Sequence, residues 1–379
     1  MTSLRTYLDH NATSPLRLEA RVAMMAALGE VGNPSSVHSE GRHARGLIDQ
    51  AREQVAALVG ARAEQVVFTS GATEANNWVL RAGWDAIAVS GIEHDSVLAP
   101  VRASSAARVD LAVTDTGEVA LSALENALTD MAARGRAMLS IQLANNETGV
   151  VQPVAEVAAL ARAHGVAVHS DAVQAAGRIP LDFDALGIDS LSLSAHKIGG
   201  PKGIGALVMR DGFEPAPLIV GGGQERRRRS GTENVTGIAG FGAAAAAAKR
   251  DLADAARIAR QRQRLEREAL AAVPGAVVIA EGAPRLVNTT CIAAPGLSAE
   301  TLVIRFDLAG VAISAGSACS SGKVGASAVL TAMGLPAEIA GSAIRVSLGW
   351  STTDSDIDAF VAAWSAIVGG SKTSRRAAA

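Results

Sequence analysis

Residues 192–203, SLSAHKIGGPKG, form the stretch that decides the fold. The alternating Leu/Ser run predicts a β-strand, and the glycines and proline after it predict a turn. Lys197 therefore stands on a rigid support where the chain leaves a strand. Such a lysine is either a solvated surface residue or a nucleophile that forms a Schiff base, and this segment alone favours the solvated residue.

A carboxylate at the end of the preceding strand changes the interpretation of Lys197. Asp171 ends the apolar run VAVHSDAVQ. A carboxylate and a lysine at the ends of successive strands are the two groups that pyridoxal phosphate needs, one for its pyridinium nitrogen and one for its aldehyde. The pair makes Lys197 a candidate cofactor lysine.

Strand–loop–helix units repeat before this segment. The predicted strands are residues 65–69, 86–90, 137–143 and 166–170. The stretch between residues 97 and 137 is predicted to be poor in helix. The repeats indicate a largely parallel sheet with helices on both faces, in which ligands bind at the carboxyl ends of the strands. Four polar residues fall at such ends: His94, Asn146, Asp171 and Lys197.

The turn after the first of these strands predicts a phosphate site. In SGATEANN, residues 70–77, small residues come first and helix formers follow. A helix that begins there presents free backbone N–H groups and a positive terminus to an anion.

The second half of the chain predicts a smaller α/β unit. Thr232 is a candidate cap for a long helix over residues 235–273, which would join two domains. Further strands are predicted at residues 276–280, 286–292, 311–314 and 343–348. We therefore expect a large domain over residues 15–250, a small domain of residues 1–14 with 251–370, and a frayed tail over residues 371–379.

The composition excludes several classes of protein. The chain has 379 residues, 49% of them hydrophobic, so it can bury one large core or two. Its 35 Lys and Arg against 37 Asp and Glu give a net charge of -2, which attracts neither nucleic acid nor an anionic membrane. Two cysteines form no disulfide framework, and the N-terminus lacks the pattern of a signal peptide. We expect a cytoplasmic protein with no nucleic-acid or membrane partner.

Several polar features have two interpretations. The run RRRR at 226–229 could bind RNA, but the chain is only 3% aromatic, so a solvated or phosphate-facing loop is favoured. His94 is either an ordinary loop histidine or a stacking partner for an aromatic cofactor that can also move protons. The seven histidines show no zinc-binding spacing, so no metal site is predicted.

The two cysteines and one arginine differ in context. Cys291, in LVNTTCIAA, is predicted to be a small buried strand residue. Cys319, in SAGSACSSGKVGAS, has the Gly/Ser-rich surroundings of an exposed thiol, and we favour a reactive role for it over a mere liability. Arg345 alternates with apolar residues in AIRVSLG and must therefore meet a carboxylate. The spacing leaves open whether that carboxylate belongs to the protein or to a substrate.

Ten motifs, in order along almost the whole chain, resemble one known family, the NifS/IscS-type cysteine desulfurases. This family is part of the class V aminotransferase group of fold-type I pyridoxal phosphate enzymes. The resemblance implies an α/β fold with a large, mostly parallel seven-stranded sheet domain and a smaller α/β domain. The motifs are YLDHNAT, GNPSSVH, FTSGATEANN, EHDSV, NNETG, SDAVQAAG, SAHKIGGPKG, GGGQERRRRSGTENV, GSACSSG and IRVSLG.

The resemblance also implies roles for single residues around pyridoxal phosphate. Lys197 would bond the aldehyde, and Asp171 would pair with the ring nitrogen. Gln174 would bond the ring hydroxyl, while His94 would stack on the ring and also move a proton from the substrate thiol. The phosphate would be held by Ala72, Thr73, Ser194, His196 and, from the neighbouring subunit, Thr232.

The implied reaction converts L-cysteine to L-alanine, with the sulfur captured as a persulfide on Cys319. Asn146 would lie near cofactor and substrate, and Arg345, helped by Asn33, would anchor the substrate carboxylate. The implied partners are a second copy of the chain, in a homodimer, and a sulfur acceptor. Because the loop 314–334 is long, that acceptor would be an iron–sulfur scaffold, and Cys319 would contact a metal only through a transient meeting with its cluster.

Three other functions remain open at this point. A selenocysteine lyase or a class V transaminase would share Lys197 and Asp171 but would not depend in the same way on a persulfide at Cys319. A catalytically idle protein that binds a scaffold would turn over no substrate.

Overall fold

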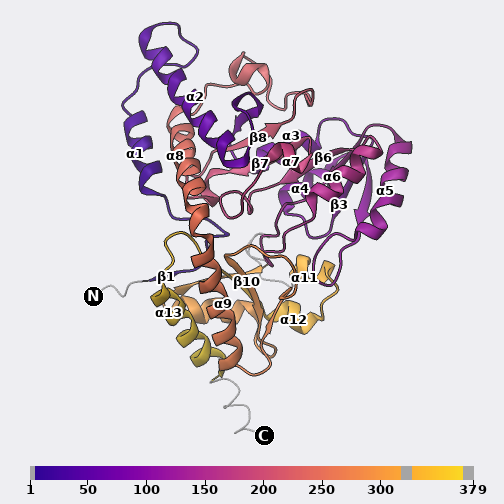
Figure 1. The fold of residues 1–379 in the computed structure, drawn as a ribbon, viewed down its shortest axis with the longest axis vertical. Coiled ribbons are helices and arrows are strands. Elements are labelled where there is room, and N and C mark those ends of the chain that lie inside the picture. Colours follow the sequence, from indigo (N-terminus) through magenta and orange to yellow (C-terminus); the bar gives the residue numbers. More distant parts are fainter. Residues whose placement is uncertain (1–4, 317–326, 370–379) are drawn as a thin grey trace.

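The structure is a computed structural model that describes residues 5–316 and 327–369. The chain forms two α/β units, one above the other in Figure 1, with the larger sheet in the upper unit. Helices α8 and α9 run end to end from the upper unit into the lower one. Among the described residues, no helix has both the length and the apolar character needed to cross a membrane.

The upper unit is built on a seven-stranded sheet with the order β2-β8-β7-β6-β5-β3-β4. Only β8 runs antiparallel to its neighbours, so the other six strands share one direction. The predicted fold class, a large and mostly parallel sheet with a smaller α/β unit, is confirmed. The strands are β2 (Val66–Thr69), β3 (Ala86–Ser90), β4 (Ala107–Leu111), β5 (Ala137–Ser140), β6 (Ala167–Asp171), β7 (Ser190–Ser194) and β8 (Gly205–Met209).

Helices cover both faces of this sheet. In β3, Ala86 and Ala88 pack into one apolar core, whereas Ile87 and Val89 pack into another on the opposite face. A strand that is buried on both faces is typical of a parallel sheet between two helical layers. The helices of this unit are α1 (Leu18–Ala27), α2 (Ser39–Val59), α3 (Ala72–Leu80), α4 (Asp95–Ala103), α5 (Leu121–Arg134), α6 (Val154–Ala163), α7 (Phe183–Leu186) and α8 (Val235–Asp251).

One sequence prediction for this unit was wrong. The stretch expected to be poor in helix contains most of α4, the strand β4 and the whole of α5. The β4 sequence ARVDL is an edge strand with two exposed charged residues, so it lacks the apolar run of a central strand. In α5, Leu124, Leu128 and Met131 are buried at helical spacing, which is a signal that the sequence did contain.

The lower unit holds a four-stranded antiparallel sheet with the order β12-β13-β10-β9. Beside it, the N-terminal strand β1 (Thr6–Tyr7) pairs in parallel with β11 (Val311–Ala312). Leu8 belongs to the core of this unit, with Phe306 and Trp364. The other elements are α9 (Ala255–Ala272), β9 (Val277–Val278), β10 (Thr289–Ala293), α10 (Ala299–Leu308), β12 (Ser314–Ala315), α11 (Ala328–Ala332), α12 (Ala337–Ser342), β13 (Ala343–Ser347) and α13 (Asp354–Trp364).

The helix predicted over residues 235–273 is two helices. α8 packs on α1 and α2 and α9 packs on α13, while the 3₁₀ turn Leu252–Asp254 between them buries no residue. The turn interrupts the helix at the crossing, so each helix follows the unit on which it packs. The domain boundaries themselves stay a prediction.

Candidate active site

Nine of the predicted site residues line one cavity of about 480 Å³. The cavity lies at the carboxyl edge of the large sheet, because β2, β3, β5, β6 and β7 all end there. This is where ligands bind in open α/β sheets. The nine residues are Ala72, Thr73, His94, Asn146, Asp171, Gln174, Ser194, His196 and Lys197.

Asp171 is the last residue of β6 and is largely buried. Its Oδ1 accepts a hydrogen bond from the backbone N–H of Val173 at 3.0 Å, and its Oδ2 accepts one from Asn76 Nδ2 at 2.8 Å. The two bonds fix the plane of the carboxylate, so that it presents a defined edge to the cavity.

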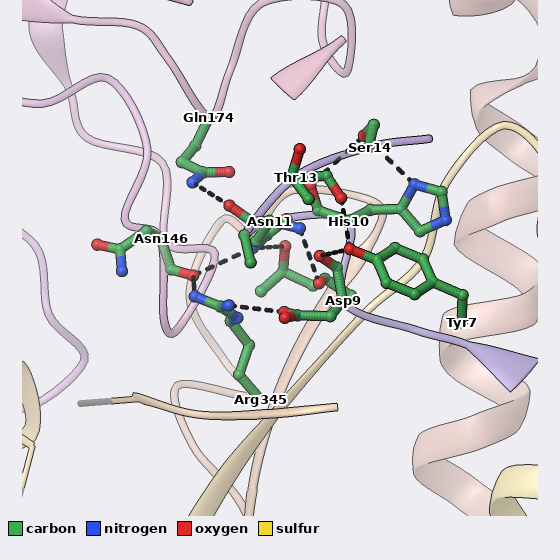
Figure 2. A network of polar contacts seen from close by, with 12 residues as sticks. Tyr7, Asp9, His10, Asn11, Thr13, Ser14, Asn146, Gln174 and Arg345 are labelled. Carbon is green, nitrogen blue, oxygen red and sulfur yellow. Dashed lines mark hydrogen bonds and ion pairs between the residues drawn. The ribbon is translucent and has the colours of Figure 1, made fainter. Parts of the chain in front are cut away.

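Lys197 ends the 3₁₀ turn Ala195–Lys197 that follows β7. Its Nζ donates hydrogen bonds to the carbonyl oxygens of Asn11, at 2.6 Å, and Ala12, at 3.0 Å. The Asn11 carbonyl also accepts from Gln174 Nε2 at 3.1 Å, a contact drawn in Figure 2. The N-terminal segment therefore forms one wall of the cavity and holds the lysine in place.

The other end of the cavity can receive an anion. Helix α3 begins after Gly71, and no side chain caps its first turn, so its N–H groups face the cavity edge with the positive end of the helix dipole. Gly205 of β8 allows this approach, because a Cβ there would meet the backbone of Gly71 at 2.7 Å. Burial, and then the charges of Lys197 and Lys202, lowers the pKa of His196 to about 4. His196 is therefore a neutral hydrogen-bonding partner at neutral pH.

His94 is the N-cap of α4. Its Nδ1 lies 3.0 Å from the backbone N of Ser96, which donates to it, and 2.8 Å from Ser96 Oγ. The cap fixes the imidazole at the end of β3, beside the cavity.

Three predicted residues do not line this cavity in the single chain. Thr232 lines a smaller neighbouring pocket of about 220 Å³, which shares Ser70 and Gly203 with it. Asn33 lies in an exposed turn, where its Oδ1 accepts from the backbone N–H of Ser35 at 2.9 Å.

Arg345 is the third. It is buried on β13, where it donates to Asp9 Oδ1 at 2.7 Å and to the Asn146 carbonyl at 3.2 Å (Figure 2). In this structure, the carboxylate that the sequence required for Arg345 therefore belongs to the protein.

Cys319 lies outside the described residues. Cys291 is buried on β10, as predicted, and burial raises the pKa of its thiol far above the ordinary value. A buried, protonated thiol of this kind is inert as a nucleophile at neutral pH.

The sequence did not predict three residues that hydrogen-bond to the site residues and hold them in place. Asn76 bonds Asp171, Ser96 bonds His94, and Asn11 bonds Lys197. Asn76 lies four residues after Ala72 in α3, so helical spacing places it on the same face, and this signal was readable. No local pattern indicates that Asn11 meets Lys197, since the contact joins residues that are 186 positions apart.

Burial of Glu93, next to His94, predicts a pH-dependent stability. Burial and, to a lesser extent, the charge of Asp171 raise its pKa from 4.5 to about 8. Between these values the folded chain binds more protons than the unfolded chain, so the free energy of unfolding falls as pH rises. We expect Glu93→Gln, which cannot ionise, to gain roughly 5 °C in melting temperature over the wild type as pH rises from about 5 to about 9.

Thermal unfolding at a series of pH values measures this difference. Glu300→Gln, on the exposed first turn of α10, is the matched control and should follow the wild type throughout. A pH-independent difference between Glu93→Gln and the wild type would mean that Glu93 is ionised in the folded chain.

Residues 6–360 match the family model of aminotransferase class V. The chain is 41% identical over 362 residues to cysteine desulfurase 2 of Trichormus variabilis, which covers 93% of this chain and 90% of the relative. It is 42% identical over 366 residues to a cysteine desulfurase of Cereibacter sphaeroides, with 93% of each covered.

Two solved structures are similar throughout. A NifS-like protein from Rickettsia africae superposes with a TM-score of 0.89 at 37% identity, covering 96% of this chain and 99% of that chain. The structure described as SspA in complex with cysteine superposes with a TM-score of 0.77 at 30% identity, covering 90% and 98%.

Proposed function

The chain belongs to the aminotransferase class V family, and from that premise we propose that it is a pyridoxal phosphate-dependent cysteine desulfurase. The observation that carries the proposal is the cavity at the end of the large sheet, where Lys197 and Asp171 meet the N-terminus of α3. Relatives named cysteine desulfurase match along 93% of the chain. A related structure was solved with cysteine.

The groups that line the cavity fit pyridoxal phosphate. An amine for the aldehyde, a carboxylate for the ring nitrogen and a positive helix terminus for the phosphate stand in one space of about 480 Å³. We propose that Lys197 and Asp171 take the first two roles and that Gln174 bonds the ring hydroxyl. His94 would pack on the ring, and Asn146 would lie between cofactor and substrate. The phosphate would be held by Ala72, Thr73, Ser194 and His196.

When bound, pyridoxal phosphate supplies an electron-withdrawing ring that stabilises the negative charge left when the substrate Cα loses its proton. Lys197 Nζ, released from the Asn11 and Ala12 carbonyls, takes that proton. Asp171 keeps a negative charge beside the ring nitrogen. These residues prepare the C–S bond of the substrate for cleavage.

We propose Cys319 as the residue that receives the sulfur. Its thiolate attacks the sulfur of the substrate, the C–S bond breaks with its electron pair moving toward carbon, and a persulfide remains on the enzyme. Protonation of the carbon then gives alanine. Arg345 and Asn33 are proposed to orient the substrate carboxylate, and for Arg345 this requires the Asp9 pair to open or to share its guanidinium.

A product analysis tests the function. We expect the purified protein, incubated with L-cysteine and a reductant, to form alanine and sulfide in equal amounts. A keto acid as the product would point to a transaminase. A much higher kcat/KM for selenocysteine than for cysteine would point to a selenocysteine lyase, and the absence of turnover in the cofactor-loaded protein would refute all three enzymes.

We also propose an oligomeric state for the protein and a destination for the sulfur. Exposed apolar residues on α1, among them Leu18, Val22 and Met25, support a homodimer in which Thr232 of each subunit reaches the phosphate of the other. A monomeric mass in sedimentation would contradict this arrangement. The persulfide sulfur would pass in the cytoplasm to an acceptor protein that assembles iron–sulfur clusters.

A further inference from the structure

A chain of hydrogen bonds runs beneath the cavity and joins Asp171 to His94. Asn76 of α3 stands at its centre and is fully buried. Its Nδ2 lies 2.8 Å from Asp171 Oδ2 and 2.9 Å from Ser96 Oγ, and its Oδ1 lies 2.9 Å from His169 Nε2. Ser96 Oγ in turn lies 2.8 Å from His94 Nδ1.

The Asp171 carboxylate fixes which way the side-chain amide of Asn76 faces. A carboxylate only accepts hydrogen bonds, so the Asn76 atom that faces it must be the amide nitrogen. The two N–H bonds of that nitrogen then go to Asp171 and to Ser96 Oγ. The Asn76 oxygen is left to accept, and it accepts from His169.

The tautomer of His169 is consistent with this orientation of the Asn76 amide. Burial lowers its pKa to about 4, so the imidazole is neutral and carries one proton. Because Nε2 must donate to Asn76, that proton is on Nε2. The other nitrogen, Nδ1, lies 2.9 Å from Ser190 Oγ and accepts from it. Every polar atom that joins the chain at this end has a matching partner.

At the other end, the hydrogen bonds to Ser96 fix which ring nitrogen of His94 carries the proton. The backbone N–H of Ser96 donates to His94 Nδ1 at 3.0 Å, so Nδ1 is an acceptor. Ser96 Oγ, which accepts from Asn76, therefore donates its own proton to the same Nδ1. A ring nitrogen that faces two donors cannot carry a proton itself, so neutral His94 carries its proton on Nε2.

We propose that Asn76 is a positioning residue that couples Asp171 to His94 and, by donating to Ser96 Oγ, helps the Ser96 backbone N–H to hold His94 in the tautomer with its proton on Nε2. The consequence rests on the function proposed above. His94 enters the reaction as a proton donor from Nε2, and it can take a proton from the substrate thiol at that atom only after it has given this one away. The hydrogen-bond coupling between Asp171 and His94 does not depend on the protein being a desulfurase.

Replacing Asn76 with aspartate should reverse the Ser96 hydroxyl. The aspartate oxygen that replaces Nδ2 lies beside Asp171 Oδ2, so the two carboxyl groups share one proton between them. That oxygen can then only accept from Ser96 Oγ, and the hydroxyl turns toward it. The Ser96 oxygen then faces His94 Nδ1 and favours a proton there, in competition with the backbone N–H of Ser96, which still donates to Nδ1. We expect the ring-nitrogen chemical shifts of His94, in the ¹⁵N-histidine-labelled full chain, to move from the Nε2–H pattern toward the Nδ1–H pattern in Asn76→Asp.

Asn77→Asp is the matched control. It makes the same chemical change one residue along α3, where Asn77 Nδ2 bonds the Thr73 carbonyl of its own helix and no other group in the part of the chain that the structure describes. This variant should keep the wild-type His94 spectrum. The cofactor-loaded Asn76→Asp enzyme should lose about 10²-fold in kcat, as expected when an acid–base residue is wrongly protonated, whereas Asn77→Asp should keep the wild-type kcat.

The wild-type spectrum alone can overturn the proposal. A proton on His94 Nδ1 in the wild type would contradict the network, even if Asn76→Asp failed to fold. An unchanged Nε2–H pattern in folded Asn76→Asp would show that Asn76 does not control the tautomer. The same spectra recorded without cofactor keep this result separate from the proposed function, which fails only if the loaded wild type makes no alanine and sulfide.

Discussion

Replacing Cys319 with alanine should lower the conversion of cysteine to alanine and sulfide by about 10⁴-fold or more. Loss of a covalent nucleophile has effects of this size, because the transferred sulfur then lacks the thiolate that receives it. The cofactor should remain bound with an unchanged absorbance spectrum, since the residues proposed to hold it lie elsewhere. Mass spectrometry should find a persulfide on the wild type after one turnover and none on the variant.

The chain supplies its own control in its other cysteine. Cys291→Ala changes a thiol that is buried on β10 and kept protonated by burial. It should keep turnover within about twofold of the wild type and lose at most about 1–2 kcal/mol of unfolding free energy through a small cavity. If Cys319→Ala turned over cysteine as fast as the wild type, the sulfur would not pass through Cys319.

Replacing Lys197 with alanine should also lower kcat by about 10⁴-fold or more, but for a different reason. The variant loses both the covalent attachment of the cofactor and the amine that moves the Cα proton. Borohydride treatment followed by peptide mapping should place the pyridoxyl group on Lys197 in the wild type and on no residue in the variant.

Lys249→Ala is the control for this second variant. Lys249 lies exposed near the end of α8, so its loss should leave both kcat and the labelled peptide unchanged. A wild-type label on any lysine other than Lys197 would overturn the assignment of the cavity. Full activity in Lys197→Ala would do the same.

The core of the site could be predicted because it depends on local patterns. Asp171 and Lys197 each follow an apolar strand, and strands that share one direction end at the same edge of a sheet. The small residues of SGATEANN also mark the start of α3 correctly. These features require only the periodicity of the chain and the chemistry of single side chains.

The rest of the site could not be predicted, because it depends on contacts between distant segments. Arg345 was expected to meet a carboxylate, but only the fold shows that Asp9, 336 positions earlier, supplies it. The edge strand β4 escaped detection for a related reason, since an edge strand is not required to be apolar on both faces. Asn76 was within a recognised motif, and only its neighbours in space reveal what it bonds.

The N-terminal wall of the cavity has a consequence for the order of events during synthesis. Residues 6–12 leave the ribosome well before their partners, since Leu8 donates to Ala312, Asp9 pairs with Arg345 and Asn11 donates to Ser347. None of these bonds can form until residues 312–347 have emerged, so this segment waits for a part of the chain that is made much later. The Asn11 and Ala12 carbonyls that hold Lys197 are therefore among the last groups to be locked in place, and a nascent chain cannot complete its cofactor pocket ahead of its C-terminal half.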